Sequence, residues 1–103
     1  MKLVFSPIAR REIDEASDWY EERREGLGQM FYDRVDEAAK LITTNPEAHP
    51  EVYKELRRAN LEQFPYSLWY LVRSDNSLVI ACLHGRRDLR LVRERALGVI
   101  PKP

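Results

Sequence analysis

Hydrophobic residues recur every three or four positions in the first 45 residues of the chain, and every second position in much of the remainder. The first region holds two such stripes: Ala9, Ile13, Ala16 and Tyr20, then Leu27, Phe31, Val35, Ala38 and Ile42. This spacing places each stripe on one face of an α-helix. We therefore predict helices over about Pro7–Arg24 and Leu27–Thr44.

The residues at the ends of these two segments favour the same boundaries. Ser6 is a suitable N-cap, and Pro7 at the first helical position loses no hydrogen bond. Glycines at positions 26 and 28 separate the segments, and Asn45-Pro46 ends the second one. Because the connection is so short, the two helices should be antiparallel neighbours.

Alternating apolar and polar positions predict β-strands in the rest of the chain. Asp75-Asn76 is a suitable two-residue hairpin turn between two of the strands. The charged tail from Arg86 to Leu97 is compatible with a short helix or an edge strand. The predicted strands cover about Lys2–Phe5, Lys54–Leu61, Tyr66–Ser74 and Ser77–His84.

The resulting order, β-α-α-β-β-β, predicts an α+β fold in which an antiparallel helical hairpin packs on one face of a curved antiparallel sheet. We expect residues 1–103 to form a single domain, because 103 residues is close to the commonest domain size. The longest apolar run, Leu78–Leu83, is far shorter than a bilayer-spanning helix. The apolar segment at the N-terminus is too short for a signal peptide, so we expect a cytoplasmic protein.

The single cysteine, Cys82, excludes an internal disulfide and a cysteine-rich zinc site. It lies in the middle of a predicted strand and should act as a small core residue. The sequence has no glycine-rich phosphate loop, no His/Cys cluster and no Ser-His-Asp pattern. We therefore expect no metal and no cofactor.

Charge is distributed unevenly, although the formal net charge is zero. Residues 1–53 contain 12 acidic and 7 basic residues, whereas residues 54–95 contain 9 basic and 5 acidic ones. This asymmetry favours a basic face that could meet an acidic partner. The alternative is an ordinary solvated surface.

Five phrases spread over nearly the whole chain resemble the RelE/ParE superfamily of bacterial type II toxins. They are FSPIARREIDEASDWYEER, GLGQMF, NPEAHP, FPYSLWYLV and ACLHGRRD. Within this superfamily, the HGRRD ending is more similar to the ParE branch, which acts on DNA gyrase, than to the RelE branch, which cuts messenger RNA on the ribosome. The resemblance implies a small toxin that is neutralised by an antitoxin encoded beside it.

Under the ParE reading, the toxin works by surface recognition, and it contacts DNA only indirectly, through the antitoxin. The antitoxin complex could be a dimer or a heterotetramer. The basic second half of the chain is then the candidate face for an acidic target. The candidate target-binding residues are Arg57, Arg58, Arg86, Arg87, Arg90 and Arg93.

The alternative reading is a ribosome-dependent endoribonuclease in which Arg58, His84 and Arg87 are catalytic. RNA cleavage needs a base, an acid and cations around the phosphate, and these three residues are of suitable types. The resemblance argues against it, because Ser67 stands where the nuclease branch has a catalytic Arg, and no Tyr follows Tyr70. His84 could equally be a structural residue at the end of an apolar strand.

Four aromatic residues on the helical hairpin are candidates for binding the antitoxin. Neighbouring residues on a helix point about 100° apart, so the two adjacent pairs cannot all face the core. An exposed apolar strip usually marks a binding surface, and the resemblance implies an amphipathic antitoxin segment that fills it. The four residues are Trp19, Tyr20, Phe31 and Tyr32.

Overall fold

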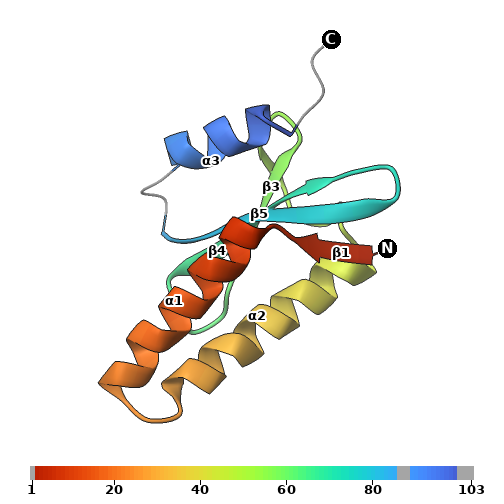
Figure 1. Ribbon diagram of the computed structural model, residues 1–103. Coiled ribbons are helices and arrows are strands. Elements are labelled where there is room, and N and C mark those ends of the chain that lie inside the picture. Colours follow the sequence, from red (N-terminus) through yellow and green to blue (C-terminus); the bar gives the residue numbers. More distant parts are fainter. Residues whose placement is uncertain (1, 86–88, 100–103) are drawn as a thin grey trace.

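The computed structural model describes residues 2–85 and 89–99, which form helices and one five-stranded sheet (Figure 1). The fold is α+β, as predicted. In chain order the elements are β1 (Lys2–Phe5), α1 (Pro7–Arg23), α2 (Leu27–Thr44), β2 (Glu51–Tyr53), β3 (Leu56–Asn60), β4 (Tyr66–Val72), β5 (Asn76–His84) and α3 (Leu89–Leu97).

The helical hairpin of α1 and α2 has the boundaries that the sequence predicts. The Oγ atom of Ser6 accepts a hydrogen bond from the backbone N–H of Ala9 at 3.1 Å, so Ser6 is the N-cap of α1. Gly26 turns the chain between the helices with φ of +92°, a conformation that costs glycine little. The Glu21 carboxylate of α1 accepts the N–H groups of Gly26 and Gly28, and so caps the start of α2.

The sheet is mixed, which corrects the prediction of a wholly antiparallel sheet. Its strand order is β1-β5-β4-β3-β2, and β1 runs parallel to β5 while the other neighbours are antiparallel. The prediction was wrong because β1 and β5 are not joined by a turn. Two helices and three strands lie between them in the sequence, so no local pattern sets their relative direction.

The predicted strand over Lys54–Leu61 is the shorter strand β3, and a strand that was not predicted, β2, precedes it across a tight turn. Lys54 takes the left-handed conformation in that turn, with φ of +49°. The turn between β4 and β5 also differs by one residue from the prediction. The N–H of Arg73 donates to the carbonyl of Asn76 at 2.8 Å, which puts Ser74 and Asp75, instead of Asp75 and Asn76, at the tip.

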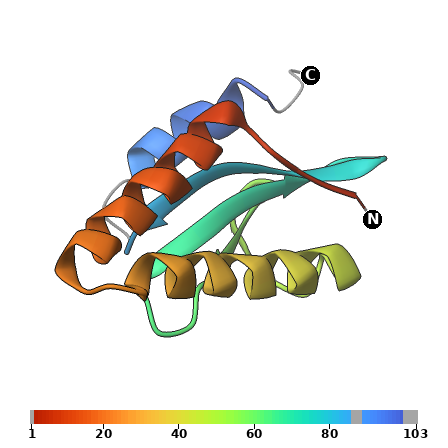
Figure 2. The same cartoon turned by 60° about the horizontal axis from the view of Figure 1, so that its bottom comes forward.

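The charged tail is a helix, α3, and its presence gives the sheet a covered second face. Residues of β4 alternate between two buried clusters: Leu68 and Tyr70 belong to the one beneath α1 and α2, whereas Trp69 and Leu71 belong to the one beneath α3. In Figure 2 the strands pass between α2 and α3. The hairpin helices and α3 therefore cover opposite faces.

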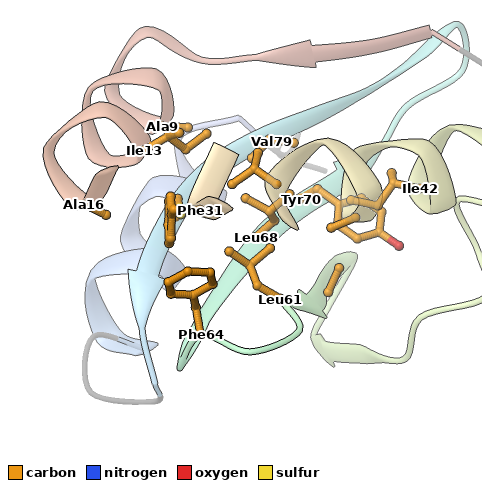
Figure 3. Close-up of a cluster of buried hydrophobic side chains, with 14 residues drawn as sticks. Ala9, Ile13, Ala16, Phe31, Ile42, Leu61, Phe64, Leu68, Tyr70 and Val79 are labelled. Carbon is orange, nitrogen blue, oxygen red and sulfur yellow. The ribbon is translucent and has the colours of Figure 1, made fainter. Parts of the chain in front are cut away.

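The core beneath the hairpin is built on aromatic side chains. Phe31 is fully buried, and its ring lies 5.1 Å from that of Phe64, edge to face (Figure 3). Cys82 is also buried in this cluster, as predicted. Leu41, the neighbour of the fully buried Ile42, is 62% exposed because it points to the other side of α2.

Candidate functional site

Three of the candidate target-binding arginines belong to the α3 side of the molecule. The Arg58 guanidinium lies over the ring of Trp69, 5.3 Å from its centroid. Arg93 lies in the same way over Tyr53, at 5.0 Å. The Arg90 side chain is 94% exposed and only loosely paired with Glu94. These three cations therefore remain near the surface, two of them held by aromatic rings.

Arg57 lies on the opposite face of β3 and holds a loop in place. Its guanidinium donates to the backbone carbonyls of His49 at 2.6 Å and Glu47 at 3.1 Å, and it forms an ion pair with Glu51 at 3.3 Å. Because its donors are engaged inside this loop, Arg57 does not belong to the same surface as Arg58. Arg86 and Arg87 lie outside the described residues.

His84 and Arg58 lie on opposite faces of the sheet. The His84 ring packs edge to face on Tyr66 at 5.3 Å, and Tyr66 packs against the cluster beneath the hairpin. Arg58, over Trp69, is on the α3 face. The structure thus does not bring together this pair from the alternative catalytic set, and Arg87, its third member, is not described.

The hydroxyl of Ser67 is hydrogen-bonded on the α3 face of the sheet. It is 4% exposed, and its Oγ donates to the Oδ1 atom of Asn60 at 2.6 Å. A hydroxyl has a single proton to donate, and here it stabilises the pairing of β3 with β4. Ser67 therefore supplies no cation at the position where the nuclease branch has an arginine.

The four aromatic candidates on the hairpin do not form one strip. Trp19 is 49% exposed, whereas Phe31 is 0% exposed, so including Phe31 in a binding surface was wrong. Tyr20 is half-buried and stacks on Phe31 at 5.7 Å. Phe31 lies inside because its helical stripe faces the sheet, and Tyr20 follows it into the core.

Tyr32 lies on the other side of α1 from Trp19. Its hydroxyl donates to the Asp14 carboxylate at 2.6 Å. This hydrogen bond, and then burial, raise the pKa of the Tyr32 phenol above its usual value, because both favour the neutral form. Trp19 follows Asp14 by five positions, which places them about 140° apart around the helix. The predicted strip is thus divided between two surfaces.

Trp19 lines a cleft of about 490 Å³ between α1 and the end of β5. Glu12, Glu15 and Trp19 form the wall on α1, and residues 82–84 form the wall on β5. The Arg23 guanidinium covers one face of the indole, 3.6 Å from the ring centroid. Trp19 is therefore ordered although it is half exposed.

A partly buried ion pair at one end of this cleft had no indication in the sequence. The Arg95 guanidinium of α3 binds both carboxylate oxygens of Glu12 on α1, each at 2.9 Å. Glu12 also accepts the backbone N–H of Cys82, and Arg95 donates to the carbonyl of Ile80. Because 83 positions separate the two side chains, no local spacing could have indicated the pair.

The ion pair depends on a β-bulge in β5. Trp69 pairs with Ala81 and Tyr70 with Val79, so Ile80 is an extra residue without a partner in β4. A bulge of this kind turns the backbone of the extra residue out of the ladder, and here its carbonyl is met by Arg95. Burial, and then the Glu12 charge, raise the pKa of the nearby Cys82 thiol to about 12.

Two further findings concern metal ligands and membrane-spanning helices among the described residues. They contain no group of three or more His, Cys, Asp or Glu side chains arranged to hold a metal ion. No helix in residues 2–85 or 89–99 is both long and apolar enough to cross a membrane.

Comparison with known proteins gives a family and a fold. The family model of the ParE toxin of the type II toxin–antitoxin system, parDE, matches residues 3–89. A solved structure titled "Chromosomal ParDE TA system from P. aeruginosa" superposes with a TM-score of 0.63 at 15% identity, over 82% of this chain and 96% of that chain. None of the curated proteins matches the sequence.

Proposed function

The chain belongs to the ParE toxin family of type II toxin–antitoxin systems, and from that membership we propose that it is a toxin that inhibits DNA gyrase and is neutralised by a cognate antitoxin. We further propose that residues 1–103 form one domain that acts in the cytoplasm. The observation that carries the proposal is the separation of Arg58 and His84 onto opposite faces of the sheet. It favours an inhibitor that binds over a nuclease that cuts.

Catalytic groups must lie within hydrogen-bond reach of one reacting phosphate. Arg58 and His84 pack against rings on opposite faces of the sheet, an arrangement that disfavours contact of both with one phosphodiester. Ser67 adds no charge between them, since its hydroxyl serves Asn60. A binding function makes no such demand, because it needs only a surface of matching shape and charge.

The proposed target surface is the α3 side of the molecule. Arg58, Arg90 and Arg93 contribute to it, and Arg86 and Arg87 are further candidates beyond the described residues. Such a cluster favours an acidic surface of the target protein over a small anion, because Arg90 and Arg93 are spread along a helix. Arg57 is not part of this proposal, since its guanidinium holds the loop before β2.

The proposed antitoxin surface is centred on Trp19, with Tyr20 behind it and Tyr32 on the other side of α1. An antitoxin segment that wraps α1 would reach both tyrosines. Replacing Trp19 by Ala should then weaken antitoxin binding by at least about tenfold. Calorimetry with folded Trp19→Ala and Tyr32→Ala proteins measures this, and losses below tenfold in both would remove this surface from the proposal.

Two parallel assays test the proposed activity. The purified chain is incubated with gyrase and relaxed DNA in one tube and with ribosomes translating a messenger RNA in the other. We expect inhibited supercoiling and intact message, with the inhibition reversed by the antitoxin. His84→Gln should inhibit as the unchanged chain does. Cleavage of the messenger RNA by the unchanged chain, and its loss in a folded His84→Gln protein, would instead identify an endoribonuclease.

A further inference from the structure

We propose that the cleft between α1 and β5 binds an extended segment of the antitoxin that places an apolar side chain against Trp19 and a lysine or arginine beside Glu15. The inference rests on the proposed function, since it names the chemistry of the antitoxin segment. Its basis is the edge of β5, the apolar wall of the cleft and the charge of the cleft.

The outer edge of β5 lacks a neighbouring strand for half its length. The residues of β1 pair with Asn76–Val79, and no other described strand continues along that side of β5. In the next part of the edge, side chains take the place of a strand, because Glu12 accepts the N–H of Cys82 and Arg95 donates to Ile80. Past these bonded groups the edge runs into the cleft, where no described strand covers it, and an uncovered strand edge is a template for an extended peptide.

The wall of the cleft opposite this edge carries a large apolar side chain that is already ordered. Trp19 offers a 49% exposed indole, and Ala16 beneath it leaves room for a side chain. Arg23 stacks on one face of the indole and fixes its position. A partner that covers Trp19 therefore gains buried area without having to order the ring.

The charge of the cleft decides which side chains can accompany the apolar one. The described residues that line it include two carboxylates, Glu12 and Glu15, and no lysine or arginine. Glu12 is already neutralised by Arg95. Glu15 is exposed and lies four residues, one helical turn, before Trp19. A cation placed here meets both a carboxylate and an indole.

The test compares two charge reversals on the helical hairpin, in the full chain with the antitoxin encoded beside it. Glu15→Lys changes the cleft, and Asp36→Lys makes the same change at an exposed position of α2. We expect Glu15→Lys to weaken antitoxin binding by at least about tenfold and Asp36→Lys by less than about threefold. Changing the matching basic residue of the antitoxin to Glu should restore the affinity for Glu15→Lys.

Trp19 also reports its own burial. The other tryptophan, Trp69, is 1% exposed, so acrylamide should quench mainly the fluorescence of Trp19. Loss of that quenching in Trp19→Phe assigns it to Trp19. We expect the antitoxin to protect Trp19 from quenching. If the antitoxin binds the unchanged chain but leaves both Trp19 quenching and the affinity of Glu15→Lys unaltered, the cleft is not its site. If it does not bind the unchanged chain at all, the proposed function itself fails.

Discussion

At Gly28 the two long helices are in close contact. A Cβ atom there would lie 2.9 Å from the carbonyl oxygen of Ser17, from its Oγ atom and from the Glu21 carboxylate. The Ser17 hydroxyl in turn donates to the Gly28 carbonyl. Glycine at this position therefore allows both the contact and the cap that Glu21 provides.

Gly28→Ala should destabilise the protein by about 1–3 kcal/mol, because the added methyl group must push α2 away from backbone atoms of α1. Urea unfolding monitored by circular dichroism measures the loss. Gly98→Ala is the matched control, since the nearest atom to its added Cβ would be 3.5 Å away. Equal stability of the two variants would show that the helices can separate at no cost.

The Cys82 thiol should be unreactive in the folded protein. Its pKa of about 12, against 9.0 without the fold, leaves very little thiolate at pH 9. We expect alkylation by iodoacetamide at that pH to be on the order of 100-fold slower or more in the folded chain than in denaturant. Rates within tenfold of each other would mean that the thiol is ionised or accessible in the folded protein.

The raised pKa of Cys82 also makes the free energy of unfolding depend on pH. Because the folded state holds the thiol proton more tightly than the unfolded state does, the contribution of Cys82 is fully present below pH 9 and declines as the pH rises toward 12. Stability measured at pH 7.5 and pH 10 should therefore fall less in Cys82→Ala than in the unchanged chain.

Among single residues, the sequence was informative where a local pattern decides the outcome. Burial of Ala9, Ile13 and Phe31 agrees with their helical spacing. Phe31 was wrongly predicted to be exposed. Its position next to Tyr32 indicates only that the two aromatic side chains point in different directions. Which of them faces inward depends on where the sheet lies. No local pattern indicated the ion pair of Glu12, since its partner, Arg95, lies in the last helix.

At the scale of elements, α3 is attached to the rest of the fold by a small apolar surface and by the contacts of its arginines. Val92 and Ala96 are fully buried against the sheet. The Arg95–Glu12 pair, with both side chains 16% exposed, joins α3 to α1 and to the bulge in β5. This arrangement ties three elements together where β5 has no neighbouring strand.

Glu12→Gln and Arg95→Met should each cost about 3 kcal/mol, because either change leaves the other charge buried without its partner. The double variant should be less destabilised than the sum of the two, and urea unfolding of all four proteins measures the coupling. Glu94→Gln is the control, since its pair with Arg90 is exposed and worth little. Additive losses would mean that the pair does not hold α3 in place.

The elements differ in how far the sequence could predict them. Both long helices, the N-terminal strand and the β4–β5 hairpin are predicted by periodicity and by residues such as Ser6 and Gly26, all of which act locally. The strand β2 and the turn at Lys54 were missed because a lysine with positive φ has no glycine or asparagine to mark the turn. The parallel pairing of β1 with β5 was missed because it joins segments far apart in the chain.

At the scale of the whole molecule, the sheet separates two surfaces. The α3 side carries Arg58, Arg90 and Arg93, whereas Trp19 and Glu15 border the cleft beside α1. The charge asymmetry of the sequence predicts a basic face, and we propose these three arginines as part of it. The separation lets one partner contact the arginines while another occupies the cleft, and Glu12 and Arg95 connect the two regions.

We infer that the chain acts by binding its target and not by cutting it. Titrating the purified chain against a fixed concentration of DNA gyrase, with supercoiling as the readout, tests this most directly. A binding inhibitor should reduce supercoiling in proportion to the complex formed, and added antitoxin should restore it. Unchanged supercoiling at a large molar excess of a folded chain that still arrests growth would contradict this inference.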